Sequence, residues 1–178
     1  MLRTPSSIND KILELCQPLN PDAEPAFIRI TPAPDADPND CFATVRRQVA
    51  AEGGRIQFGW TIWGWPRVFV EAEHHAVYAP PGGAPWLDLS PSAMPGITRR
   101  LFLPDDTATY DFENEGIRRD NVRLAIADDP LVHQFFRLAE ERNDILNAIP
   151  GVGWLPSRET PPSGFSATSN RPPRSSSS

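Results

Sequence analysis

Lysine, cysteine and long apolar runs are all scarce in this chain of 178 residues. Lys11 is the only lysine, and the net charge of −6 argues against the basic surface that nucleic-acid binding requires. No apolar run reaches the length of a membrane span, and the N-terminus lacks the basic-then-apolar pattern of a secretory signal. We therefore expect a cytoplasmic protein whose partners include neither nucleic acid nor a membrane.

The two cysteines, Cys16 and Cys41, are too few to form a disulfide framework. Cys16 falls on a short predicted helix, where it is expected to act as a small apolar residue. A reducing compartment would keep Cys41 as a free thiol. The sequence thus offers one cysteine that is available for chemistry.

Proline is abundant, and much of it lies in the loop region 18–38 and near the C-terminus. From residue 155 onward the chain is mainly Pro, Ser, Arg and Thr, which gives too little apolar area to support folding. The sequence therefore predicts a single α+β domain over residues 1–154 and a disordered Pro/Ser-rich tail over residues 155–178.

Cys41 is predicted to lie in the first turn of a helix. Asn39 and Asp40 are good N-cap residues, and apolar residues follow at helical spacing until Gly53 ends the helix. The free N–H groups and the positive end of the helix dipole favour a thiolate at Cys41, whereas the negative charge of Asp40 opposes it.

A strand pattern follows and ends with two adjacent histidines, His74 and His75. Since side chains alternate along a strand, only one of the two rings can face Cys41. After a Pro-Pro-Gly-Gly turn, a short apolar segment can run back beside this strand and bring Asp88 close to a histidine. A thiol, an imidazole and a carboxylate are the three parts of a cysteine nucleophile system.

The order of these residues resembles the papain-like superfamily, and in particular its transglutaminase-like branch. The matching residues are Cys41-Phe42-Ala43, His75-Ala76-Val77-Tyr78 and Trp86-Leu87-Asp88-Leu89-Ser90-Pro91. The sequence departs from the branch at Val77, where Trp is usual, and at Leu89-Ser90, where the Asp-Pro-Thr pattern would continue. The segment is also similar to uncharacterised bacterial proteins, some of which carry a SEC-C metal motif that this sequence lacks.

The resemblance implies a papain/transglutaminase-like core, in which the Cys-bearing helix packs on an antiparallel sheet, with an additional C-terminal helix. It implies a cysteine hydrolase or acyltransferase with Cys41, His75 and Asp88 as catalytic residues and no cofactor or metal. The substrate would be a peptide, a protein side chain or a small acyl or amide compound. Trp63, Trp65 and Glu73 are the candidates for substrate binding.

Three alternatives remain open at this point. His74 could replace His75 as the base if the strand faces the other way. The fold could persist as a binding module that has lost its chemistry. Cys41, a histidine and Asp88 could instead supply three ligands to zinc, although paired Cys-x-x-Cys or His-x-x-x-His signatures are absent from the sequence.

The clearest helix in the sequence begins at Asp128-Asp129-Pro130 and runs to about Ile149. Apolar residues recur on one of its faces: Leu131, Phe135, Leu138, Ile145 and Ile149. This pattern predicts that the helix packs against the sheet.

Overall fold

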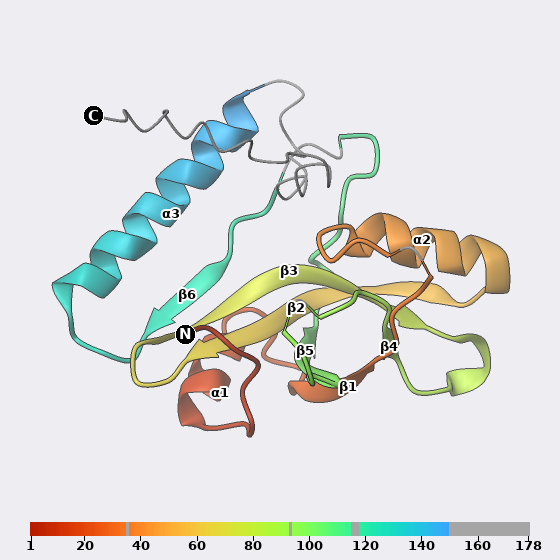
Figure 1. The fold of residues 1–178 in the computed structure, drawn as a ribbon, viewed down its shortest axis with the longest axis horizontal. Helices are drawn as coiled ribbons and strands as arrows, with labels where there is room; N and C mark the ends of the chain where they lie inside the picture. Colours follow the sequence, from red (N-terminus) through yellow and green to blue (C-terminus); the bar gives the residue numbers. More distant parts are fainter. Residues whose placement is uncertain (35, 93, 115–117, 150–178) are drawn as a thin grey trace, which may run out of the picture.

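The computed structural model describes residues 1–34, 36–92, 94–114 and 118–149. The predicted tail, residues 155–178, lies outside the described residues. Within them the fold is mixed α/β and includes a C-terminal helix, as the sequence indicates (Figure 1).

The helices are α1 (Asp10–Cys16), α2 (Cys41–Glu52) and α3 (Pro130–Ala148), with a short 3-10 turn at Pro81–Gly83. The strands are β1 (Ala26–Ile30), β2 (Arg55–Trp65), β3 (Phe69–Ala79), β4 (Leu87–Asp88), β5 (Arg99–Pro104) and β6 (Val122–Ala125).

The sheet closes on itself. Its strand order is β2-β5-β1-β4-β3-β6, and β2 pairs with both β5 and β3, so five strands form a closed, barrel-like sheet to which β6 is attached. The expectation of an antiparallel sheet is correct for every pairing except β1–β4, which is parallel. β2 and β5 approach each other closely where the sheet closes. A side chain at Gly59 would not fit there, because its Cβ would overlap the Leu103 carbonyl oxygen.

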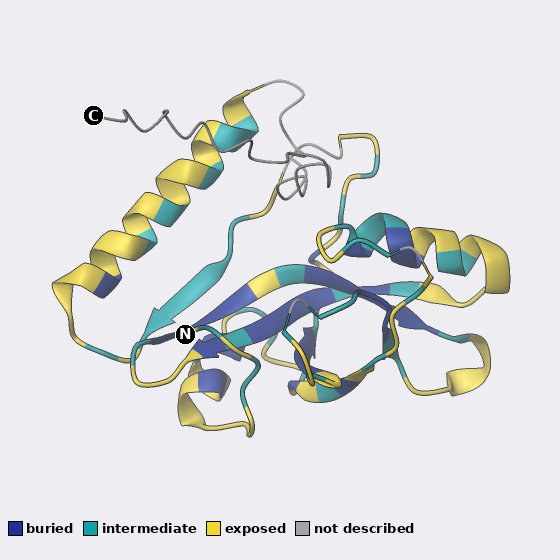
Figure 2. Cartoon of the chain, in the orientation of Figure 1, coloured by how far each residue is buried: buried dark blue, intermediate teal, exposed yellow. Residues whose placement is uncertain are grey.

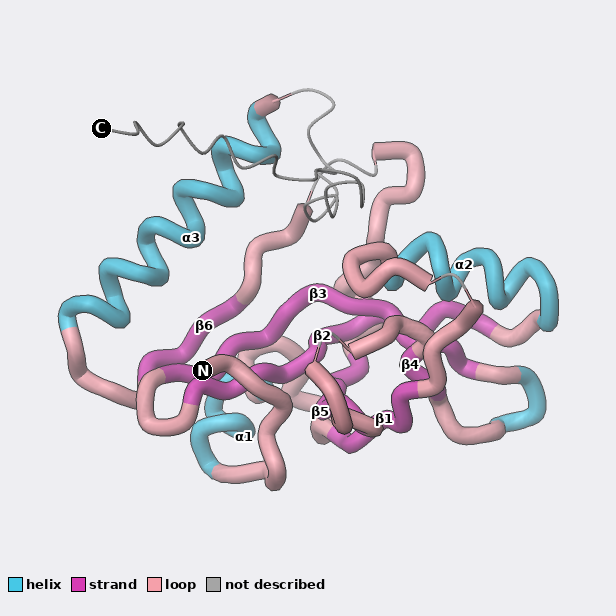
Figure 3. The backbone as a smooth tube through the Cα atoms, viewed as in Figure 1, coloured by secondary structure: helices cyan, strands magenta, loops and turns pink. Residues whose placement is uncertain are grey.

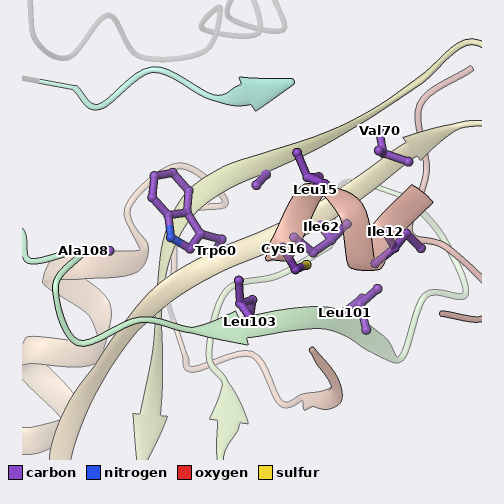
Figure 4. Packing of buried hydrophobic residues seen from close by; sticks show 10 residues of the cluster. Ile12, Leu15, Cys16, Trp60, Ile62, Val70, Leu101, Leu103 and Ala108 are labelled. Atoms are coloured by element: carbon purple, nitrogen blue, oxygen red, sulfur yellow. The ribbon is translucent and has the colours of Figure 1, made fainter. Parts of the chain in front are cut away.

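The largest hydrophobic cluster lies between α1 and strands β2, β3 and β5 (Figure 4). Asn9 caps α1 by accepting a hydrogen bond from the Ile12 backbone N–H at 3.1 Å, which fixes the helix start. Ile12, Leu15 and Cys16 are then buried against the sheet. Cys16 is therefore a core residue, as the sequence predicts.

α2 packs on another part of the sheet, with Val45 completely buried against Ala76, Tyr78 and Leu89. Gly53 ends the helix with a positive φ of 74°, and its carbonyl accepts a hydrogen bond from the Tyr78 hydroxyl at 3.0 Å. These contacts fix both the position and the direction of the helix that begins at Cys41.

The prediction that the last helix packs against the sheet is correct only for the first turns of α3. Val132 is the buried residue of α3, and the apolar residues expected to be buried are exposed (Figure 2): Leu131, Phe135, Leu138, Ile145 and Ile149. The first turns of α3 contact the sheet through Phe69, whose ring lies 5.4 Å from that of Phe135 and 5.5 Å from that of Phe136. Beyond this point α3 diverges from the sheet (Figure 1), so periodicity identified the helix correctly but not what its apolar face contacts.

Candidate functional site

Cys41 is the first residue of α2 and is 7% exposed. The Asp40 side chain makes no cap hydrogen bond, and its Oδ2 instead lies 3.5 Å from Nη1 of Arg47. The N–H groups of the first helical turn are thus not bonded by that side chain, and they carry the positive end of the helix dipole. This is an environment that stabilises a negative sulfur atom.

A loop leads from β1 to α2, the helix that begins at Cys41 (Figure 3). The N–H of Thr31 donates to the Asp88 carbonyl at 2.7 Å, and the N–H of Ala33 donates to the Leu89 carbonyl at 2.9 Å. The parallel pairing of β1 with β4 therefore continues past the strand ends and directs the chain to the start of α2.

His75 faces the inside of the barrel-like sheet, where it is 5% exposed. It shares strand parity with Val77, which packs with Ile28 and Phe102 in the cluster inside the barrel. On its outer edge β3 pairs with β6 over Phe69–Ala72 and with β4 at Tyr78. His75 lies between these two pairings, where Cys41 is close enough to raise the pKa of its ring.

Asp88 is completely buried and pairs with His75. Its Oδ2 lies 3.2 Å from Nε2 of His75, an ion-pair contact, while its Oδ1 accepts a hydrogen bond from the Ser90 N–H at 2.9 Å. The structure thus brings together the three residues selected from the sequence, in the order thiol, imidazole, carboxylate.

Arg100 is a fourth member of this group that sequence reasoning missed. Its Nη1 lies 2.9 Å from Oδ2 of Asp88, and its Nη2 donates to the Pro91 carbonyl at 2.8 Å. Its guanidinium also lies 5.8 Å from the centre of the Trp63 ring, a cation–π distance. The signal in the sequence was an arginine directly before three consecutive apolar residues of a strand, with the same strand parity as Phe102.

The electrostatic environment favours the charged form of His75. Burial lowers the pKa of the imidazole, but the negative charges of Cys41 and Asp88 outweigh burial and raise that pKa to about 10. The pKa of Asp88 is lowered even though burial would raise it, because His75 and Arg100 are both close. At neutral pH the site therefore contains an imidazolium beside the Asp88 carboxylate.

We expect the His75 ring to remain protonated throughout the neutral range and to lose its proton near pH 10. In Cys41→Ala the ring should titrate at a lower pH, because the largest contribution that raises the His75 pKa is removed. The pH dependence of the ring ¹⁵N chemical shifts measures both values. Titration of His75 near its ordinary pKa of 6.5 in both proteins would contradict this description.

His74, the reserve base, occupies a different environment. Its Nε2 lies 2.6 Å from the Ala108 carbonyl, to which it donates, and its ring packs against Phe42 and Trp60. Burial lowers the pKa of His74, so the ring is neutral at pH 7. It is the neighbouring histidine, His75, that contacts Asp88.

A cleft of about 1060 Å³ opens over Cys41 and His75. Trp63 and Glu73 both line it, and the Trp63 indole N–H donates to Oε2 of Glu73 at 2.7 Å. Trp65, the third predicted substrate contact, does not line this cleft; it is 43% exposed and packs against Phe69 with ring centres 6.0 Å apart. The far wall of the cleft is formed by α3 residues that the sequence did not suggest.

Among the described residues no group of three or more His, Cys, Asp or Glu side chains could hold a metal ion. The zinc alternative therefore lacks a ligand set in this part of the chain. In addition, the Asp88 oxygen that a zinc site would need as a ligand already forms an ion pair with Arg100.

No helix in the described parts of the chain combines the length and apolar character needed to cross a membrane. Comparison of the chain with protein-family models, with curated proteins and with solved structures gives no match.

Proposed function

We propose that this protein is a cysteine hydrolase or acyltransferase that acts on an amide, isopeptide or thioester bond. One observation carries the proposal: Cys41 begins a helix beside a buried histidine that is itself paired with a buried carboxylate. This arrangement supplies a nucleophile, a proton carrier and a group that orients the proton carrier. A papain/transglutaminase-like core is part of the proposal, supported by the packing of the Cys-bearing helix on the strand that carries His75.

The first half-reaction forms an acyl-enzyme. The Cys41 thiolate attacks the acyl carbon, and the oxygen of the tetrahedral intermediate accepts hydrogen bonds from N–H groups in the first turn of α2. The His75 imidazolium donates its proton to the leaving nitrogen or sulfur atom, and the bond to that atom breaks. The products are a thioester at Cys41 and a free amine or thiol.

The second half-reaction releases the acyl group. Neutral His75 removes a proton from water or from an acceptor amine, which attacks the thioester carbon. Cys41 leaves as a thiolate and the ion pair is restored. Water gives a carboxylic acid, whereas an amine gives a new amide.

Asp88 and Arg100 are positioning residues in this scheme. Asp88 holds the ring of His75 through Nε2, which leaves the other ring nitrogen for the thiol. Arg100 holds Asp88 in turn. Because Cys41 must remain a free thiol, the proposal places the protein in a reducing compartment such as the cytoplasm.

Iodoacetamide should modify Cys41 selectively at neutral pH. A free thiol is only a few per cent thiolate under these conditions, so Cys41 in an ion pair should react about tenfold faster than a free thiol. Cys16 should lag, because burial raises its pKa to about 11. Peptide mapping by mass spectrometry measures both rates.

In the same assay Cys41→Ala should form no acyl-enzyme with an activated thioester, while its circular dichroism stays unchanged. If Cys41 reacted no faster than a free thiol, the nucleophile proposal would fail. A binding module without turnover would then be the better description.

A further inference from the structure

The cleft over Cys41 is rich in arginine although the chain as a whole is acidic, with a net charge of −6. The arginines that line it are Arg100, Arg118, Arg119, Arg123 and Arg142. The carboxylates that line it are Asp40, Glu73 and Asp120. Such local reversal of charge concentrates oppositely charged ligands at a site.

Two of these arginines are committed to carboxylates of the protein. Arg100 pairs with the buried Asp88 at 2.9 Å. Arg123 pairs with Asp120 at 2.9 Å and with Glu71 at 3.3 Å. These two guanidinium groups therefore maintain the structure of the cleft.

Arg119 and Arg142 are exposed and have no carboxylate partner among the described residues. The Arg119 guanidinium lies 5.7 Å from the centre of the Trp60 ring, and its Nη2 reaches the Thr109 carbonyl at 3.5 Å. Neither contact neutralises its charge. Two positive charges at the cleft are thus available to a ligand.

Hydrogen bonds between α3 and the segment before β6 hold these two arginines on the same wall. The Asn147 side chain accepts from the Arg118 N–H at 2.9 Å and donates to the Arg118 carbonyl at 2.9 Å. Asn143 donates to the same carbonyl at 3.4 Å. Since Arg119 follows Arg118 and Arg142 precedes Asn143, the bonds bring the backbones of Arg119 and Arg142 close together, and both residues line the cleft.

The same face of α3 contributes apolar surface. Phe135, Leu138 and Ala139 line the cleft, and Leu138 lies one helical turn before Arg142. The exposed apolar residues Phe135 and Leu138 of α3 are therefore cleft-lining residues. α3 thus presents to the cleft a hydrophobic strip that is followed by a positive charge.

We infer that the acyl substrate of this protein carries a carboxylate, as an acidic peptide does, and that Arg119 and Arg142 bind it. The inference rests on the function proposed above. Guanidinium groups bind carboxylates through charge-assisted, often bidentate hydrogen bonds, and a partly enclosed cleft strengthens such bonds.

Two isosteric electrophiles test the inference without a known substrate: the iodoacetyl derivatives of glutamate α-amide and glutamine α-amide. They differ only in one side-chain carboxylate, which lies several bonds beyond the reacting carbon. We expect the glutamate probe to modify Cys41 about tenfold faster than the glutamine probe, the effect of one hydrogen bond between charged groups. Mass spectrometry of the Cys41 peptide measures both rates in the full-length protein.

The double variant Arg119→Gln/Arg142→Gln should bring the ratio of the two rates close to one. Both side chains are exposed, so the variant is expected to fold, and circular dichroism verifies this. Arg137→Gln is the matched control, because Arg137 is an exposed arginine of the same helix that does not line the cleft. It should leave the ratio unchanged.

The outcomes separate this inference from the proposed function. A Cys41 that reacts with neither probe overturns the proposed function. A Cys41 that reacts equally with both probes overturns the carboxylate inference alone, and a preference that survives in the double variant overturns the assignment to Arg119 and Arg142.

Protection from iodoacetamide distinguishes two sources of negative charge. N-acetylglutamate should protect Cys41 in a saturable manner, whereas inorganic phosphate at equal concentration should not. Protection by phosphate alone would indicate a phosphorylated ligand and would overturn the inference that the substrate carries a carboxylate.

Discussion

Replacing His75 with glutamine should slow the transfer of an acyl group from an activated thioester to Cys41 by about 10²–10⁴-fold, the usual contribution of general acid–base catalysis. In the proposed mechanism His75 supplies both the positive charge that stabilises a thiolate at Cys41 and the proton for the leaving group. Glutamine keeps much of the volume and the hydrogen-bonding capacity of the ring but carries no charge. The time course of the acyl-enzyme mass measures the rate.

His74→Gln is the matched control on the adjacent residue. A glutamine amide can still donate to the Ala108 carbonyl, which His74 Nε2 contacts at 2.6 Å. We expect the acylation rate of this variant to stay within a few-fold of the original. The reverse result, in which His74→Gln loses acylation and His75→Gln retains it, would assign the base to His74.

Replacing Asp88 with alanine should lower the free energy of unfolding by about 3–5 kcal/mol, because it removes one partner of a buried ion pair. Asp88 is completely buried, and Arg100 is 6% exposed. The variant leaves the Arg100 guanidinium inside the barrel without its carboxylate, and it leaves His75 without the anion at 3.2 Å. Equilibrium unfolding in urea, followed by circular dichroism, measures the loss.

The exposed pair of Lys11 and Glu14 provides the control. Their atoms are 2.7 Å apart, closer than those of the buried pair, but the side chains are 45% and 52% exposed. Lys11→Ala should therefore change the free energy of unfolding by no more than about 1 kcal/mol. Equal losses of unfolding free energy in Asp88→Ala and Lys11→Ala would show that burial does not make the Asp88 ion pair more stabilising than an exposed one.

The local elements around the candidate site could be predicted from sequence because each depends on neighbouring residues. Helical spacing and a terminal glycine defined α2 and placed Cys41 at its start. Alternation defined β3, and the resemblance selected His75 over His74. In the structure it is His75 that contacts Asp88.

The remaining features depend on contacts between distant residues, which a local pattern does not specify. The parallel pairing of β1 with β4 joins residues about 58 positions apart, Arg29 with Leu87 and Ile30 with Asp88. The ion pair of Arg100 with Asp88 follows from the barrel that this pairing closes. The apolar face of α3 correctly indicated an amphipathic helix. The same sequence pattern is expected whether that face packs on a sheet or lines a cleft, so the pattern could not distinguish the two.

Closure of the sheet also affects how this protein behaves in a crowded solution. A strand with an unpaired edge can recruit a strand from another molecule, which is a common first step in aggregation. Here β1 to β5 each have neighbours on both sides, and β6, with four residues, is the terminal strand of the described sheet. Among the described strands, β6 is therefore the one with no neighbouring strand along a whole edge, and this short strand carries Arg123, which lines the cleft.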